Sequence, residues 1–146
     1  MGVELNILGI RQKERVDKNG AAFFDCPKIN MGMVVNKPIE VLRVARGATT
    51  LHGDGRYILE VKFMGDVYKL ITNSIRMKPF IDSLLEADVT RFKTVIIDAG
   101  GKFYEMDANK TEIVEVSGRP IEMLNGKVVY SDNKEEVLTF GNNNHN

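Results

Sequence analysis

A mainly β fold with one helix is predicted by the periodicity of this 146-residue sequence and by its turn signals. Between two groups of strand-like runs, residues 74–87 carry apolar side chains at helical spacing. Met64-Gly65 and Asn125-Gly126 are two-residue signals for β-hairpins. The strand-like runs themselves, short and rich in alternating or β-branched residues, cover residues 39–46, 56–63, 66–72, 91–97 and 102–106.

The residues between these runs favour the ends of each element. Lys37-Pro38 suits the entrance of the first strand, and residues 49–55, rich in turn formers, predict a loop after it. Ser74 suits the N-cap of the helix, although the regular helix could begin only at Pro79. Residues 98–101 predict a hairpin between the last two runs.

The resulting order, β-β-β-α-β-β, is the connectivity of a five-stranded OB barrel. We therefore expect a β-rich α+β fold with an OB-like core over residues 37–107, although the same order could describe another small α+β sheet. An N-terminal β extension over 1–36 would pack on this core, and C-terminal strands and a hairpin would cover 108–140. Residues 141–146 are expected to be a disordered tail. The further candidate strands are residues 3–10, 21–24, 31–35, 111–116 and 136–140.

Composition predicts a protein of a reducing compartment that does not enter a membrane. There is one cysteine, Cys26, and no signal peptide or apolar run of the roughly 20 residues that span a bilayer. We therefore expect a cytoplasmic protein. Twenty basic and twenty acidic residues cancel, which argues against strong non-specific polyanion binding but allows a local basic face.

No constellation for catalysis or metal binding is visible, so we expect a protein that is not an enzyme and needs no cofactor. The histidines are His52, in the expected loop, and His145, in the tail, and neither has a metal-ligand partner at suitable spacing. Gly100-Gly101-Lys102 lacks the frame of a phosphate-binding loop and is better explained as a hairpin turn.

Strand alternation predicts a basic face on one side of the sheet, because successive side chains point to opposite faces. Glu60 is its one clear acid. Cations would meet phosphate groups, and an aromatic ring would stack on a base. The alternative is that lysine and arginine simply occupy solvent-facing strand positions. The candidate nucleic-acid-binding residues are Arg43, Arg56, Lys62, Lys69, Arg91, Lys93, Lys102 and Tyr104.

Residues 66–106 contain a series of short motifs: Thr72-Asn73-Ser74, Leu84-Leu85, Phe92 with Thr94 and Ile96, Gly100-Gly101, and Phe103-Tyr104. Through these motifs the segment resembles small phage-type OB-fold single-stranded DNA-binding proteins. The resemblance implies a phage or bacterial accessory protein of replication or recombination, which would act in the host cytoplasm if it is phage-encoded. The sequence departs from well-known bacterial single-strand binders because it lacks tryptophan and an acidic tail ending in Pro-Phe.

The sequence therefore predicts single-stranded DNA binding through the basic face, with Tyr104 stacking on a base. The alternative is a non-enzymatic protein-interaction or structural subunit, such as a virion or accessory component, that forms a homo-oligomer through its sheet. A third candidate contact is the basic run 11–18, whose interspersed acids favour a solvated loop. The apolar residues that would serve the oligomer interface are Val67, Ile71, Val95 and Met106.

Overall fold

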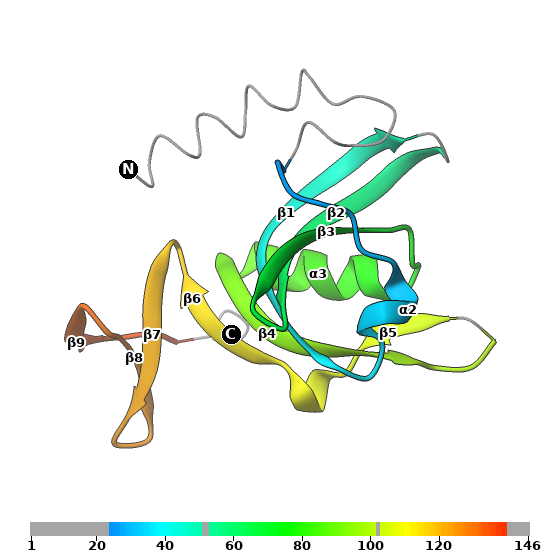
Figure 1. Ribbon diagram of the computed structural model, residues 1–146. Helices are drawn as coiled ribbons and strands as arrows, with labels where there is room; N and C mark the ends of the chain where they lie inside the picture. The colour runs from blue at the N-terminus through cyan, green and yellow to red at the C-terminus, as the bar shows by residue number, and fades with distance from the viewer. Residues whose placement is uncertain (1–23, 51–52, 102, 140–146) are drawn as a thin grey trace.

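The computed structural model describes residues 24–50, 53–101 and 103–139, which form one antiparallel sheet with two α-helices and a short 3-10 helix, η1. The strands lie in the order β3-β2-β1-β4-β6-β7-β8-β9, and β5 pairs with β4 beside this path (Figure 1). The prediction of a mainly β fold is confirmed. The elements are α2 (Met31–Val34), β1 (Pro38–Thr50), β2 (Gly53–Phe63), β3 (Asp66–Thr72), α3 (Met77–Glu86), β4 (Val89–Asp98), β5 (Tyr104–Met106), η1 (Ala108–Lys110), β6 (Glu112–Val116), β7 (Arg119–Leu124), β8 (Lys127–Tyr130) and β9 (Asn133–Val137).

The longest strand, β1, joins the two halves of the core sheet. It pairs with β2 over most of its length and with β4 near its start, and three register shifts interrupt its pairing with β2. Such irregularities bend a strand and increase its twist. The prediction of a loop over residues 49–55 is wrong. Strand β1 extends to Thr50 and β2 begins at Gly53, and these two residues pair with each other.

The sheet is open, so the predicted closed five-stranded barrel is wrong. The strand order β3-β2-β1-β4-β5 and the position of α3 between β3 and β4 agree with the predicted connectivity. However, β5 has only three residues and pairs with β4, and the described residues contain no pairing of β3 with β5. Side-chain bonds alone join the start of the helical segment to β5 in the described residues: Ser74 Oγ donates to the Tyr104 carbonyl at 2.7 Å, and Arg76 donates to Glu105 at 3.1 Å.

The free edge of β3 is occupied by a segment near the N-terminus. Lys69 N donates to the Pro27 carbonyl at 2.8 Å, and Ile29 N donates to the Lys69 carbonyl at 2.9 Å. A polar edge that is already paired in this way is not available to β5. The chain then forms α2, which buries Val34 in the core. The strand predicted at 31–35 is wrong, because the amide of Val35 bonds locally to the Met31 carbonyl.

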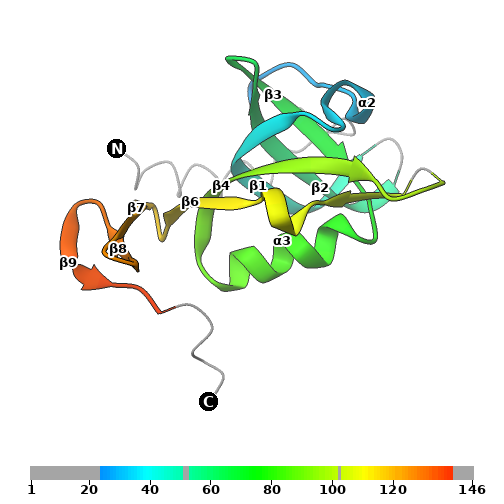
Figure 2. The same cartoon turned by 90° about the horizontal axis from the view of Figure 1, so that it is seen from below.

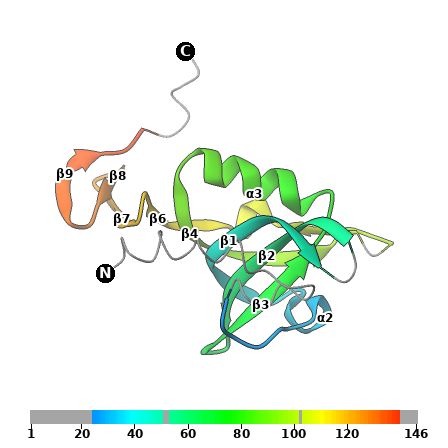
Figure 3. The same cartoon turned by 90° about the horizontal axis from the view of Figure 1, so that it is seen from above.

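The helix α3 packs its apolar side on the core sheet, and α2 lies on a different side of the strands (Figures 2 and 3). Met77 and Ile81 are fully buried. Ser74 Oγ accepts from the Met77 amide at 3.1 Å, as predicted for a capping side chain, but the helix begins at Met77 and Arg76 occupies its N-cap position. Pro79 is tolerated because it lies in the first turn, where an amide has no intrahelical partner.

Strands β7, β8 and β9 project away from the core sheet and form what we call the C-terminal arm, residues 119–137 (Figures 1 and 2). The hairpin predicted at Asn125-Gly126 is confirmed, since both residues have positive φ angles of 53° and 79° and join β7 to β8. Every residue of β9 is exposed, and this strand lies at 133–137 rather than at the predicted 136–140. The candidate strand at 3–10 and the tail at 141–146 lie outside the described residues. Of the candidate strand at 21–24 only Phe24 is described, and it lies in a bend.

Candidate nucleic-acid interface

The face on which the candidate cations gather carries alternating charges. We call it the outer face: it is the side of β1–β4 and β6 that presents Glu40, Glu60, Lys62, Lys93 and Glu112. Strand register places Glu40 opposite Lys62 on β2 and opposite Lys93 on β4, and Lys93 opposite Glu112 on β6. Opposite charges on facing positions stabilise neighbouring strands. The expectation that Glu60 is the one acid of this face is therefore wrong.

Two of the candidate arginines are held by carboxylates on this face. Arg43 binds Glu60 through two bonds of 2.7 and 2.9 Å, and this hydrogen bonding raises the pKa of the arginine. Arg91 donates to Glu40 at 2.8 Å and lies 4.0 Å from Glu115. Both pairs lower the positive charge that a phosphate group would meet.

Lys69 was expected to be a solvent-facing contact, and this is wrong. Its side chain is only 7% exposed, and its ammonium donates to the Phe24 carbonyl at 3.4 Å. It is covered because the segment that pairs with the edge of β3 continues over the outer face. The ion pairs among the described residues include none that involves Lys69.

Several other predicted contact residues are partly or fully covered, and one lies outside the described residues. Tyr104 is partly buried and packs against the core, so its ring is not an open stacking platform. Arg56 is partly buried and has interaction partners. Lys102 lies outside the described residues. Met106, expected in an exposed oligomer interface, is 5% exposed and belongs to the core, because β5 turns it inward against the core cluster.

Lys62 and Lys93 are exposed candidate cations. Arg43 is exposed as well, but Glu60 binds it. The two lysines flank Glu40 across three neighbouring strands. Within the described part of the chain, no ion pair joins either ammonium group to a carboxylate. These two lysines are the part of the predicted site that is open to a phosphate group.

A feature that the sequence analysis missed is a strap over the outer face, which we define as residues 24–29. Phe24 packs on Ile58, which is fully buried although it lies in the outward row of β2. Cys26, Ala45 and Ile71 pack around this pair. Burial raises the pKa of the Cys26 thiol. One feature of the sequence could have predicted this cover: Ile58 is an apolar residue among the charged residues of the outward row of β2.

A second polar cluster connects α3 to the β1–β2 hairpin. Tyr57 Oη donates to Asp82 at 2.7 Å, and Arg46 donates to the same carboxylate oxygen at 3.0 Å. The bond from Tyr57 and the pair with Arg46 hold the pKa of Asp82 below its usual value. Burial and the bond to Asp82 raise the pKa of Tyr57. This cluster fastens the helix to the sheet and leaves no free base or nucleophile.

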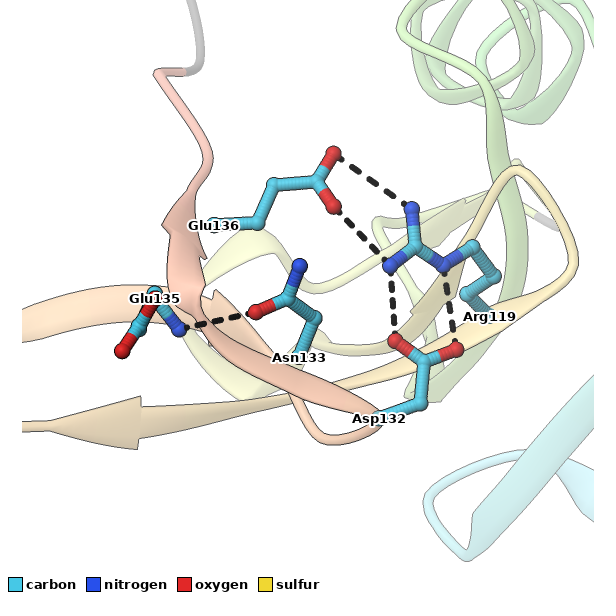
Figure 4. Close-up of polar contacts among 5 residues, drawn as sticks. All are labelled: Arg119, Asp132, Asn133, Glu135 and Glu136. Carbon is cyan, nitrogen blue, oxygen red and sulfur yellow. Dashed lines mark hydrogen bonds and ion pairs between the residues drawn. The ribbon is translucent and has the colours of Figure 1, made fainter.

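The C-terminal arm is held by a cluster around Arg119 (Figure 4). Its guanidinium donates to Asp132 at 2.7 and 3.1 Å and to Glu136 at 3.0 and 3.4 Å. The same group lies 3.6 Å from the centre of the Tyr130 ring. These bonds raise the pKa of Arg119 and lower that of Asp132. The cluster ties β7 to the β8–β9 turn.

The described residues contain no metal site and no membrane-spanning helix. No group of three or more of their His, Cys, Asp and Glu side chains is placed to hold a metal ion. None of the described helices is long and apolar enough to cross a bilayer. A shallow cavity of about 240 Å³ lies between β6, β8 and the residues after β9, lined by Ala87, Val116, Tyr130, Glu136, Val137, Leu138 and Thr139.

Comparison with known proteins shows one family. Residues 25–107 match the family described as Domain of unknown function (DUF8468). No curated protein matches the chain, and no solved structure matches it. The family match covers residues 25–29 of the strap, α2, β1–β5 and α3, and it ends before β6. Because this range is more than half of the 146 residues, the chain belongs to the DUF8468 family.

Proposed function

We propose that the protein binds single-stranded DNA through the outer face of its core sheet, as an accessory protein of phage or bacterial replication or recombination. The observation that carries the proposal is the strand order β3-β2-β1-β4-β5 with a helix between β3 and β4. OB folds have this connectivity, and they bind oligonucleotides on the face around their second and third strands. The resemblance of residues 66–106 supports the accessory role.

The exposed lysines define where the phosphate chain would lie. Lys62 and Lys93 stand on β2 and β4, on either side of Glu40. A backbone that crosses the strands from one lysine to the other would pass over this carboxylate. Because Glu40 is paired with Arg91, its repulsion is reduced. Binding through so few free cations should be moderate in affinity and sensitive to salt.

Fluorescence anisotropy with a labelled oligothymidine of roughly 20 nucleotides tests this proposal at low and moderate salt. The logarithm of the affinity should fall with the logarithm of salt concentration, by about 0.7 per phosphate neutralised. The double variant Lys62→Glu/Lys93→Glu should weaken binding at low salt at least about tenfold. Lys127→Glu is the matched control, because Lys127 is exposed on the C-terminal arm.

Glu40→Gln gives the opposite test on the same face. Removing this charge should strengthen binding and raise the salt dependence, because both flanking lysines and Arg91 lose their neighbouring carboxylate. An absence of binding at low salt for the unaltered protein, or affinity without a salt slope, would contradict the proposal.

A second function, protein interaction or oligomerisation, is favoured by apolar side chains on the C-terminal arm. Met123 is 64% exposed and Val137 46% exposed, and Leu124, which follows Met123 in the chain, is exposed as well. Exposed apolar residues of this kind mark interaction surfaces. Light scattering of the unaltered chain and of Met123→Ser/Leu124→Ser tests this function: a stable oligomer that the double variant dissociates, with no DNA binding by either, would favour it over the first.

A further inference from the structure

We infer that the strap occupies a nucleotide-binding subsite on the outer face, and that a single-stranded ligand must displace residues 24–26 to fill it. This inference rests on the proposed function and names the place where one nucleotide binds. Three observations carry it: how the Phe24 ring is held, what its carbonyl binds, and how residues 24–26 are attached.

The Phe24 ring lies in an environment that also suits a nucleobase. Its ring is 6% exposed and packs on Ile58, with Ala45 and Ile71 at the sides. The guanidinium carbon of Arg43 lies 4.8 Å from the ring centre. An apolar floor with an arginine plane above it is a recurrent way to hold an unpaired base. Arg43 is itself held in place by its two bonds to Glu60.

The carbonyl of the same residue lies where a phosphate oxygen would be better bound. Lys69 is buried, and its ammonium has three donors. The Lys69 ammonium donates a hydrogen bond to the Phe24 carbonyl at 3.4 Å, a distance that is long for a charged donor. Burying a poorly bonded charge is unfavourable. A phosphate oxygen at this position would form a shorter, charge-assisted bond with Lys69.

The two halves of the strap contact different parts of the molecule. Pro27 and Ile29 bond to the backbone of Lys69, and Ile29 belongs to the main core cluster. Phe24 belongs to a separate, smaller cluster, and Cys26 N bonds locally, to the Phe24 carbonyl at 3.0 Å. A ligand that displaces residues 24–26 therefore does not have to break the backbone pairing of residues 27–29 with the edge of β3.

The geometry also selects the class of ligand. A base must lie flat between Ile58 and Arg43 while its phosphate reaches Lys69, as an unpaired nucleotide of a single strand can. Bases of a duplex are stacked and paired, and must be extruded to enter such a pocket. The subsite should therefore prefer single-stranded over double-stranded DNA.

Phe24→Ala in the full chain tests the inference by removing the competing ring. The variant should bind the labelled oligothymidine at least about fivefold more tightly, because no Phe24 ring remains to compete with a base for the site. Phe24→Leu keeps an apolar cover and should bind almost as the unaltered chain does. Ile75→Ala, at an exposed apolar side chain before α3, is the control that should change nothing.

The single cysteine gives a second measurement that needs no variant. Cys26 is half-covered in the strap, so its rate of reaction with a thiol reagent reports whether the strap is lifted. Adding the oligothymidine to the unaltered protein should raise this rate. It should also rise in Phe24→Ala without oligonucleotide.

The outcomes separate the two proposals. If the unaltered protein and Phe24→Ala bind DNA equally, and DNA leaves the Cys26 rate unchanged, the strap inference is overturned while DNA binding stands. If Cys26 reacts faster in Phe24→Ala but neither protein binds DNA at low salt, both proposals are overturned. Should Phe24→Ala fail to fold in a circular dichroism check, the Cys26 rate of the unaltered protein with DNA decides the inference.

Discussion

The core sheet and the C-terminal arm are built from the same kind of antiparallel hairpins but are stabilised differently. In the core sheet, residues 38–106, buried apolar side chains such as Phe92 and Leu59 face α3 and α2. In the arm, residues 119–137, Val129 is the buried apolar residue and every position of β9 is exposed. Ile121 and Tyr130 of the arm are partly buried against the core cluster, and the arm otherwise depends on hairpin turns and on the bonds of Arg119.

This difference shows that regular strand pairing does not by itself make a region part of the core. Burial of apolar area stabilises the first region, and it scales with the surface removed from water. Exposed ion pairs contribute little each, so the second region should open locally more readily. The family match covers the first region and stops before the second.

The largest expected effect is the loss of a central core side chain. Phe92→Ala should lower the free energy of unfolding by about 3–5 kcal/mol, because it leaves a cavity under β4 that the sheet cannot fill. Val137→Ala in the arm, where the side chain is exposed, should change stability by less than about 0.5 kcal/mol. Urea denaturation of both variants measures this contrast, and equal losses would contradict it.

The next effect is confined to the arm. Arg119→Met should abolish the bonds to Asp132 and Glu136, and the amides of β8 and β9 should then exchange hydrogen faster. Amides of β2 and β4 should keep their protection. Hydrogen exchange read by mass spectrometry checks this, with Arg46→Met as the control for loss of another exposed arginine pair. Faster exchange throughout the core would show that the arm is an integral part of the fold.

A smaller effect should follow from exchanging turn residues between the two regions. Met64 and Asn125 each precede a glycine and have positive φ angles of 51° and 53°. Asparagine tolerates this conformation better than methionine. Met64→Asn should therefore raise the free energy of unfolding by roughly 0.5–1 kcal/mol. Asn125→Met should leave the global value unchanged and speed exchange in β7 and β8, and a global loss would count against independent opening of the arm.

The smallest effect is a pH dependence centred on Asp82. Its pKa is lower in the folded protein than in the unfolded chain, where it is about 3.9. The carboxylate therefore stabilises the fold fully above that value, and this contribution is lost as the pH falls through the folded pKa. Thermal unfolding at pH 7 and pH 3 should show a smaller acid-induced loss for Asp82→Asn than for the unaltered protein. Glu86→Gln, exposed on the same helix, is the control.

Much of the core sheet could be predicted from the sequence because its signals are local. Strand β3 was predicted at its observed bounds, and β4 within two residues. The capping bond of Ser74 and the Asn125-Gly126 turn were also predicted, since each depends on neighbouring residues. The helical turn at α2 was not, because a short apolar run such as 31–35 suits either a strand or a helix.

The candidate site was predicted less well, because its properties depend on neighbours across strands. Alternation placed Arg43, Arg91 and Lys93 on one face, but only the strand register shows which carboxylates oppose them. Residues far along the chain, Glu40 and Glu115, pair with Arg91. The net charge of a sheet face depends on the side chains of several neighbouring strands, so it cannot be predicted from the pattern of one strand.

By itself the sequence determined that this chain is mainly β, where most strands and the main helix lie, and which side of each core strand is apolar. Those features follow from periodicity and from turn residues, which act over a few positions. Only the tertiary structure decided that the sheet stays open, that charges alternate on its outer face, and that Phe24 covers Ile58. These depend on contacts between distant segments. The free edge of β3 is paired with residues 27–29, for which no strand was predicted.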